Sequence, residues 1–378
     1  MDKLKVAVVG AGNRGPQHMT TVVGIPDRFD LVGICDMDDE KREAAVAKFA
    51  APGFTQLEDM LDKAKPDLVC LIVSQSALPT LVPIVAQAGV HMATETPISA
   101  SLPQADLVIK AAADGGVKLE NFEQCWRWPR EQLKWSIMDS GVLGATLQVR
   151  CYTYVAPYHA NAVFRRMAGD QRVKKLVGFG RDLPQSPTQA REGQESRPRK
   201  WVVAGVEFEN GLTGVWEAKI QASRLSGHDF TNVSADFENG HIVHDKIYIS
   251  REAAKPKEGG AHNDGRRMVE YTIQEGWEDL QGHNILTSVW IDTDPVMKWE
   301  NPYKQYAPEP IYAGSDDYGR LEEYIHYHRV ILNDEEPEYG VERARHNAEV
   351  MIAAYHSAQN NSQVMEFPID PTIETSFW

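Results

Sequence analysis

Cysteine is scarce in this sequence, and no two cysteines stand at the spacing of metal ligands. Four occur in 378 residues, each alone in an apolar stretch: Cys35, Cys70, Cys125 and Cys151. Without a C-x-x-C pair or a nearby histidine, they form neither a disulfide framework nor a cysteine-based metal site. His326 and His328 are two positions apart, on different faces of a helix, so we expect no metal. We expect reduced, buried thiols and a cytoplasmic location.

Basic charge and long apolar runs are also lacking. Lysine and arginine number 39 against 54 acidic residues, which gives a net charge of −15 and argues against nucleic acid as a partner. The first apolar stretch is too short for a secretion signal. The most apolar window, 68–90, is broken by polar residues and prolines, so we expect no membrane span.

The residues that are present are typical of an ordered protein with two domains. In the first third of the chain, short apolar runs alternate with stretches of helical composition. The expected strands are Lys3–Val9, Leu31–Cys35, Asp67–Val73, His91–Thr94 and Lys118–Phe122, and the expected helices are 15–23, 39–49, 78–88 and 104–114. This alternation predicts an α/β domain with a doubly wound, parallel Rossmann sheet over residues 1–123.

Residues 124–378 have a different pattern. Longer alternating runs predict a largely antiparallel sheet, and three helical stretches accompany them. The expected strands are 147–155, 201–207, 214–221 and 242–250, and the expected helices are 131–140, 316–332 and 341–360. Stretches rich in Pro, Gly and Ser predict loops at 182–199 and 252–267. The second domain is therefore expected to be α+β.

A glycine-rich loop joins the first strand to the first helix. Glycines in this G-x-G-x-x-G context allow a tight turn and let backbone amides at a helix N-terminus approach a pyrophosphate. We expect the loop to bind a dinucleotide through Gly10, Gly12, Asn13, Arg14 and Gly15. Asp36 ends the second strand, where a carboxylate accepts hydrogen bonds from a ribose and repels a 2′-phosphate. NAD is favoured, with NADP as an alternative because Lys41 and Arg42 are near.

Along nearly its whole length the sequence resembles the family of glucose–fructose oxidoreductase, inositol dehydrogenase and rhizopine catabolism proteins (Gfo/Idh/MocA). The resemblance is carried by Gly89–Pro97, Gly116–Pro129 and Glu342–Ala358. It implies hydride transfer between NAD and a carbinol carbon of a sugar, glycoside or cyclitol. It also implies association into dimers or tetramers through the outer face of the second-domain sheet.

The resemblance extends to the residues expected around the nicotinamide. The family's Glu-Lys-Pro turn, whose lysine polarises the substrate hydroxyl, reads Glu95-Thr96-Pro97 here. A threonine hydroxyl donates a hydrogen bond but carries no charge. Further polar cofactor contacts are expected from Ser74, Gln75, Glu95 and Gln124.

The family's catalytic histidine, which follows an aspartate by one helical turn, aligns with His159 when counted back from Gly169. Val155 then stands at the aspartate, so the sequence offers no carboxylate for this histidine. Tyr158 is an alternative base, and Thr96 completes the catalytic candidates.

Arginines supply the candidate substrate contacts. Arg165 and Arg166 belong to a basic cluster that could clamp an anionic sugar, or could form a solvated helix face. Arg127, beside two tryptophans at the end of the last Rossmann strand, is expected at the substrate crevice.

Three functions remain open. The first is an NAD-dependent dehydrogenase. The second is a glycosidase that oxidises its substrate transiently, eliminates the aglycone, adds water and returns the hydride, so that NAD is recycled; Thr96 at the lysine position favours it. The third is a binding protein that has lost catalysis.

Overall fold

The computed structural model describes residues 2–153, 157–183, 199–219, 232–252, 266–280, 282–306 and 315–375. Most of the loops expected at 182–199 and 252–267, together with Val155, lie outside these ranges. The described helices include none that is both long enough and apolar enough to cross a bilayer. All four cysteines are buried and unpaired, as expected for reduced, buried thiols.

The first domain is built on six parallel strands in the order β3-β2-β1-β4-β5-β6. They are β1 (Leu4–Val9), β2 (Phe29–Cys35), β3 (Gly53–Phe54), β4 (Leu68–Leu71), β5 (His91–Glu95) and β6 (Leu119–Phe122). The Rossmann sheet predicted from the sequence is therefore confirmed. Only β3 was not predicted, because two residues do not make a recognisable apolar run.

Helices cover both faces of this sheet because successive side chains of a strand point to opposite faces. Val6 and Val8 of β1 join one core, and Ala7 and Val9 join the other. The first face carries α1 (Gly15–Val23) and α2 (Asp39–Phe49), and the second carries α3 (Leu57–Ala64), α4 (Leu78–Gln87) and α5 (Leu102–Asp114).

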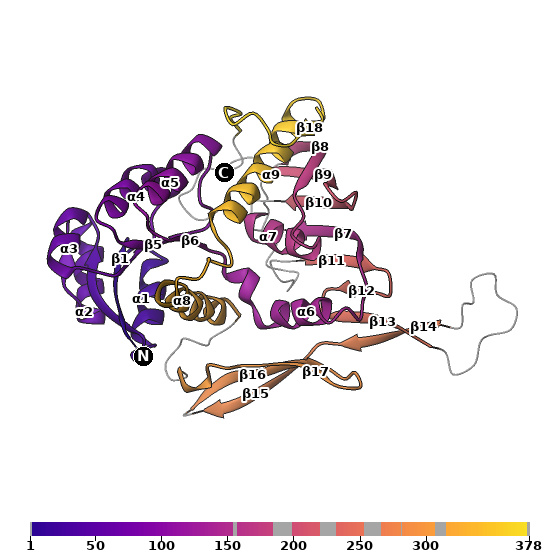
Figure 1. Ribbon diagram of the computed structural model, residues 1–378, viewed down its shortest axis with the longest axis horizontal. Coiled ribbons are helices and arrows are strands. Elements are labelled where there is room, and N and C mark those ends of the chain that lie inside the picture. The colour runs from indigo at the N-terminus through magenta and orange to yellow at the C-terminus, as the bar shows by residue number, and fades with distance from the viewer. Residues whose placement is uncertain are drawn as a thin grey trace, which may run out of the picture.

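Helix α8 (Ser315–Asn333) also packs on the first face, although it lies late in the chain. Leu321 and Tyr324 share their core with Val6 and Val8, and Figure 1 shows α8 beside α1. The division of the chain at residue 123 stays a prediction. The structure adds α8 to the helical layer of the first domain.

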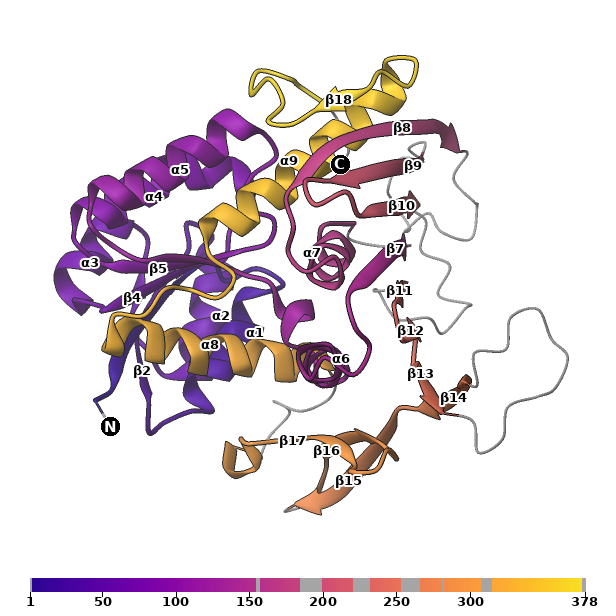
Figure 2. The same ribbon diagram turned by 45° about the vertical axis from the view of Figure 1, so that its right-hand side comes forward.

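The second domain is built on a nine-stranded sheet in the order β14-β13-β12-β11-β7-β10-β9-β8-β18. Its strands are β7 (Thr146–Thr153), β8 (Val173–Leu183), β9 (Arg199–Phe208), β10 (Thr213–Lys219), β11 (Asn232–Phe237), β12 (Gly240–Val243), β13 (Lys246–Glu252), β14 (Arg266–Thr272) and β18 (Met365–Glu366). Its pairings are antiparallel except that of β10 with β7. Helices α7 (Pro157–Met167) and α9 (Val341–Gln359) cover the face turned toward the first domain (Figure 2).

Two local expectations for this domain were incomplete. The single strand expected at 242–250 is a hairpin of β12 and β13, because His244 adopts a left-handed φ of 55° and turns the chain. A second sheet, β15 (Gln274–Leu280), β16 (His283–Ile291) and β17 (Met297–Glu300), was not predicted, and it packs against α6 (Pro129–Asp139). Strand β15 is mostly polar and exposed, so its sequence carries no strand signal.

Candidate active site

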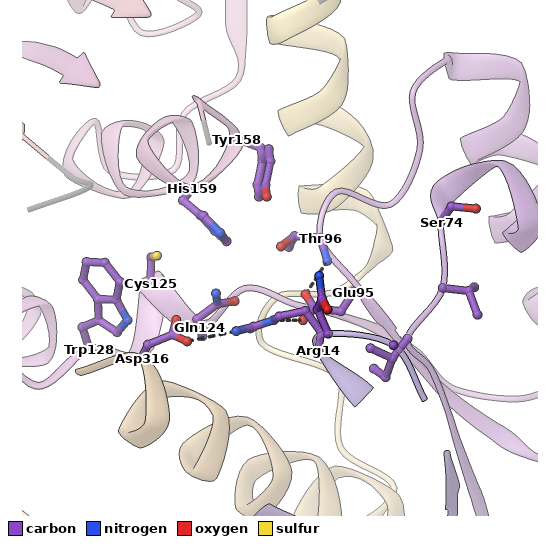
Figure 3. Close-up of a pocket in the computed structure, with 14 residues that line it drawn as sticks. Arg14, Ser74, Glu95, Thr96, Gln124, Cys125, Trp128, Tyr158, His159 and Asp316 are labelled. Atoms are coloured by element: carbon purple, nitrogen blue, oxygen red, sulfur yellow. Dashed lines mark hydrogen bonds and ion pairs between the residues drawn. The ribbon is translucent and has the colours of Figure 1, made fainter. Parts of the chain in front are cut away.

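A cavity of about 640 Å³ opens at the carboxyl ends of β1, β4 and β5, where the Rossmann sheet faces α7 and α8 (Figure 3). Parallel sheets bind ligands at this edge, beside the point where the strand order reverses. The lining residues are Gly12, Asn13, Arg14, Ile72, Val73, Ser74, Glu95, Thr96, Gln124, Cys125, Trp128, Tyr158, His159 and Asp316. The structure therefore brings together most of the residues that the sequence proposed for cofactor and catalysis.

The glycine-rich loop has the geometry that a dinucleotide requires. Gly10 has a φ of +100°, and a Cβ there would lie 2.2 Å from the carbonyl oxygen of Ile72. A Cβ on Gly15 would lie 2.0 Å from the carbonyl oxygen of Gly10, so the tight turn excludes any larger residue at either position. Gly12 faces open space, which leaves its backbone accessible to a pyrophosphate.

Asp36 stands at the end of β2, next to this loop. Its Oδ2 accepts a hydrogen bond of 2.6 Å from the backbone amide of Ala11. The two nearby cations are engaged: Lys41 pairs with Asp38 at 2.6 Å, and Arg42 donates to the backbone carbonyl of Asp36 at 3.0 Å. This arrangement fits NAD better than NADP.

Glu95, at the end of β5, is held as a carboxylate by two partners. Burial acts to raise its pKa, but the hydrogen bonds and charges of His18 and Arg14, at 3.0 Å and 2.8 Å, outweigh burial and hold the pKa well below its usual range. Arg14 also contacts Asp316 at 3.1 Å. Its charge is thus compensated within the cavity wall.

Thr96 is buried beside Glu95, with 8% of its surface exposed. Its Oγ1 has no hydrogen-bond partner among the described residues, although it lines the cavity. A buried hydroxyl without a partner is costly, so this atom is available to a ligand.

His159 lies on α7, and its Nδ1 is 2.5 Å from Oε1 of Glu123. Glu123 directly follows β6 and caps the short helix η2 (Gln124–Arg127), where the same Oε1 accepts the amide of Cys125 at 3.2 Å. Both side chains are buried, with 8% of His159 and none of Glu123 exposed.

Glu123 was not predicted from the sequence, because the family pattern places the carboxylate one helical turn before His159, at Val155. The structure supplies one from the other domain, 36 residues earlier. The position of Glu123 in the sequence could have indicated its role. Glu123 directly follows the last Rossmann strand and precedes Gln124, which was expected near the nicotinamide.

Tyr158 lines the cavity with its ring centroid 4.3 Å from that of His159. Burial, with added repulsion from the carboxylates of Glu123 and Glu95, raises the pKa of Tyr158 well above its ordinary value. Its phenol therefore stays protonated and suits a hydrogen-bond donor better than a base.

The three arginines expected at the substrate do not line the cavity. Arg127 is buried between Glu120 at 3.2 Å and Glu338 at 3.0 Å. Arg165 donates to the backbone carbonyl of Arg343, and Arg166 lies over the rings of Trp126 and Trp135. Gln75 also lies outside the lining, because it begins the short helix η1 (Gln75–Ala77) just beyond Ser74.

Comparison with known proteins agrees with an NAD-binding Rossmann domain. Residues 4–122 match the sequence model of GFO_IDH_MocA, an oxidoreductase family with an NAD-binding Rossmann fold. Inositol 2-dehydrogenase of Salmonella typhimurium is 25% identical over 157 residues, 40% of this chain and 46% of that protein. Glycosyl hydrolase family 109 protein 1 of Akkermansia muciniphila is 27% identical over 158 residues, 39% of this chain and 32% of that protein. The chain thus spans less than half the length of either curated relative.

Similarity in fold extends over the whole chain. The crystal structure of the WlbA dehydrogenase from Bordetella pertussis, in complex with NADH and UDP-GlcNAcA, has a TM-score of 0.66 at 19% identity and covers 97% of this chain and 99% of that one. Fold and loop define an NAD-binding domain of the Rossmann type. The match of residues 4–122 to the Gfo/Idh/MocA family model agrees with the resemblance seen in the sequence.

Proposed function

We propose that the protein is an NAD-dependent dehydrogenase that oxidises a carbinol carbon of a sugar or cyclitol. The observation that carries this function is the convergence of the glycine-rich loop, the free hydroxyl of Thr96 and the paired His159 on one cavity. NAD, when bound, supplies the hydride acceptor. Gly12 and Asn13 would hold its pyrophosphate, and Asp36 its adenosine ribose.

His159 acts as the base that takes the proton of the substrate hydroxyl. Tyr158 and Thr96 donate hydrogen bonds that orient the carbinol oxygen or the nicotinamide amide. Trp128 offers an aromatic face at the cavity wall for the ring of the substrate.

An uncharged, polyhydroxylated substrate fits this wall better than an acidic sugar. Among the described lining residues the one cation is Arg14, and both Glu95 and Asp316 compensate its charge. The names of two relatives, inositol 2-dehydrogenase and D-apiose dehydrogenase, support a neutral polyol.

The test is the production of NADH by purified protein from a panel of free sugars and cyclitols. We expect turnover with at least one neutral polyol, and we expect His159→Asn to lose about 10²–10⁴-fold in kcat. Ligand binding without any exchange of the carbinol hydrogen would instead identify a non-catalytic binding protein.

A second function is favoured by Thr96, which replaces the family lysine, and by the glycosyl hydrolase among the relatives. In this mechanism the hydride returns to the substrate after the aglycone has been eliminated and water added. Release of nitrophenol from nitrophenyl glycosides, without net NADH, would establish it. Steady NADH formation from free sugars would exclude it.

Association of identical chains is also proposed. The described apolar side chains exposed on the face of the nine-stranded sheet turned away from α7 and α9 include Leu147, Val177, Phe179 and Val215. Such a patch favours an interface between copies of the chain. The cytoplasmic location stays a prediction.

A further inference from the structure

We infer that Glu123 is the positioning residue of His159: it selects the tautomer of the imidazole and stabilises the imidazolium that forms during oxidation. This role rests on the dehydrogenase function proposed above. Glu123 supplies, from the end of β6, the carboxylate that the sequence lacks at Val155.

The hydrogen bonds at Glu123 determine which ring nitrogen carries the proton. Its Oε1 lies 2.5 Å from Nδ1 of His159 and also accepts the backbone amide of Cys125, so the carboxylate is held from two sides. A carboxylate only accepts hydrogen bonds, so Nδ1 must be the protonated nitrogen. The unshared electron pair is then on Nε2, which is the nitrogen left to receive a substrate proton.

The charge balance favours proton transfer to this histidine. When the substrate O–H bond breaks, its proton goes to Nε2, and the carbinol hydride goes to NAD as the carbonyl forms. The buried pair of Glu123 and His159 changes from one net negative charge to none. The imidazolium then lies beside the carboxylate of Glu123, so its positive charge is paired inside the protein.

Other titratable groups surround Glu123 on the neighbouring elements. They are Glu95 on β5, Cys125 on η2, Tyr158 on α7, Glu323 on α8 and Tyr339 before α9. Burial raises the pKa of Cys125, Tyr158, Glu323 and Tyr339 and favours their neutral forms. Glu95 forms an ion pair with Arg14 and a hydrogen bond with His18. The side chain of His159 lies in direct hydrogen-bond contact with Glu123.

A metal ion is the competing explanation, since Glu123, Cys125 and His159 offer ligand atoms within 4.8 Å of one another. Two ligands at about 2.0–2.1 Å from a tetrahedral zinc ion are about 3.3 Å apart. The Nδ1–Oε1 distance of 2.5 Å is too short for these two atoms to bind one ion together, so they are joined directly by a hydrogen bond.

The experiment compares Glu123→Gln and Glu123→Asp with Glu120→Gln, a matched change at another buried glutamate, on β6, whose partner is Arg127. The first readout is the ¹⁵N NMR spectrum of histidine-labelled protein, with His159→Asn to assign the signal. We expect protonation at Nδ1 in the wild type and in Glu120→Gln, and a shift toward Nε2 in Glu123→Gln, because an amide can donate to Nδ1.

The second readout is the rate of hydride transfer, measured in a single turnover and in steady state. In Glu123→Gln, kcat should fall about 10²–10⁴-fold with little change in KM or NAD affinity, and Glu123→Asp should recover part of the lost rate. An unchanged tautomer in Glu123→Gln, or stoichiometric zinc in the purified wild type, would overturn the inference. If Glu123→Gln does not fold, the spectra of Glu123→Asp and of the wild type decide the matter: both should show protonation at Nδ1, and protonation at Nε2 in the wild type would overturn the inference. Because the spectrum requires no substrate, a wild-type protein that oxidises no sugar would defeat the proposed function alone.

Discussion

Arg14 and Asp316 lie 302 positions apart in the sequence, and their side chains meet at 3.1 Å. Arg14 belongs to the glycine-rich loop and Asp316 to the first turn of α8, so the contact joins the cofactor loop to a helix from the far end of the chain. Both side chains line the cavity (Figure 3).

Asp316→Asn should weaken NAD binding more than it weakens folding. Arg14 and Asp316 are 34% and 43% exposed, so loss of their ion pair should lower the free energy of unfolding by less than about 1 kcal/mol. Release of Arg14 should raise the Kd for NAD about 3- to 10-fold, because the loop loses one anchor. Asp30→Asn, which breaks an equally long exposed pair with Lys3, is the control and should leave the Kd unchanged. Equal Kd values for Asp316→Asn and wild type would contradict this prediction.

Thr96→Val should leave folding intact while it impairs catalysis. The substitution removes a buried hydroxyl that has no partner among the described residues, so the free energy of unfolding should stay constant or rise by up to about 1 kcal/mol. The loss of one hydrogen bond to the ligand should lower kcat/KM about tenfold.

Thr94→Val provides the matched control, two residues earlier on β5. Thr94 is also buried, but its Oγ1 accepts a hydrogen bond of 3.1 Å from Asn121. Its replacement should destabilise the protein by about 1 kcal/mol in urea denaturation. A larger loss of stability in Thr96→Val than in Thr94→Val would show that the Thr96 hydroxyl is already satisfied.

Stability should depend on pH through Glu120. Burial raises its pKa to about 7, although Arg127 opposes the shift, whereas the unfolded chain has a pKa of about 4.3. Between these values the folded state keeps a proton that the unfolded state releases. The contribution of Glu120 to stability is therefore complete below pH 4.3 and is lost as the pH rises through 7.

Glu120→Gln removes this dependence because the amide stays neutral. Its free energy of unfolding, relative to the wild type, should rise by about 3 kcal/mol between pH 4.5 and pH 8. Glu207→Gln is the control: Lys175 and Lys174 lower the pKa of this surface carboxylate, so the free energy of unfolding of its variant, relative to the wild type, should not rise with pH. A constant difference between Glu120→Gln and wild type across this range would refute the shift.

Phe179→Asp should dissociate the oligomer that we propose. Phe179 is 59% exposed on β8, in the apolar patch of the outer sheet face, and a charge there would be buried in the interface. Light scattering should report a dimer or tetramer for the wild type and a monomer for the variant. Met37→Asp, at an 87% exposed position near the Rossmann sheet, should leave the mass unchanged. A wild-type protein that is already monomeric would contradict the proposed interface.

Much of the first domain and of its cofactor site could be predicted from the sequence. Gly10, Gly15 and Asp36 act through backbone conformation and chain order, which are local properties, and each has the position that the motif implied. His159 could be proposed by alignment. The hairpin at His244 and the polar strand β15 could not, because alternation does not reveal where a chain turns or which polar strand finds a partner.

By itself the sequence determined the Rossmann domain, its preference for NAD and the replacement of the family's lysine by Thr96. These properties depend on neighbouring residues and on short turns. Only the tertiary structure decided that Glu123 meets His159, that Arg127 is enclosed by Glu120 and Glu338, and that α8 returns to the first domain. Such contacts join side chains separated by tens to hundreds of residues. They follow from how the two domains pack, and no local pattern of residues encodes that packing.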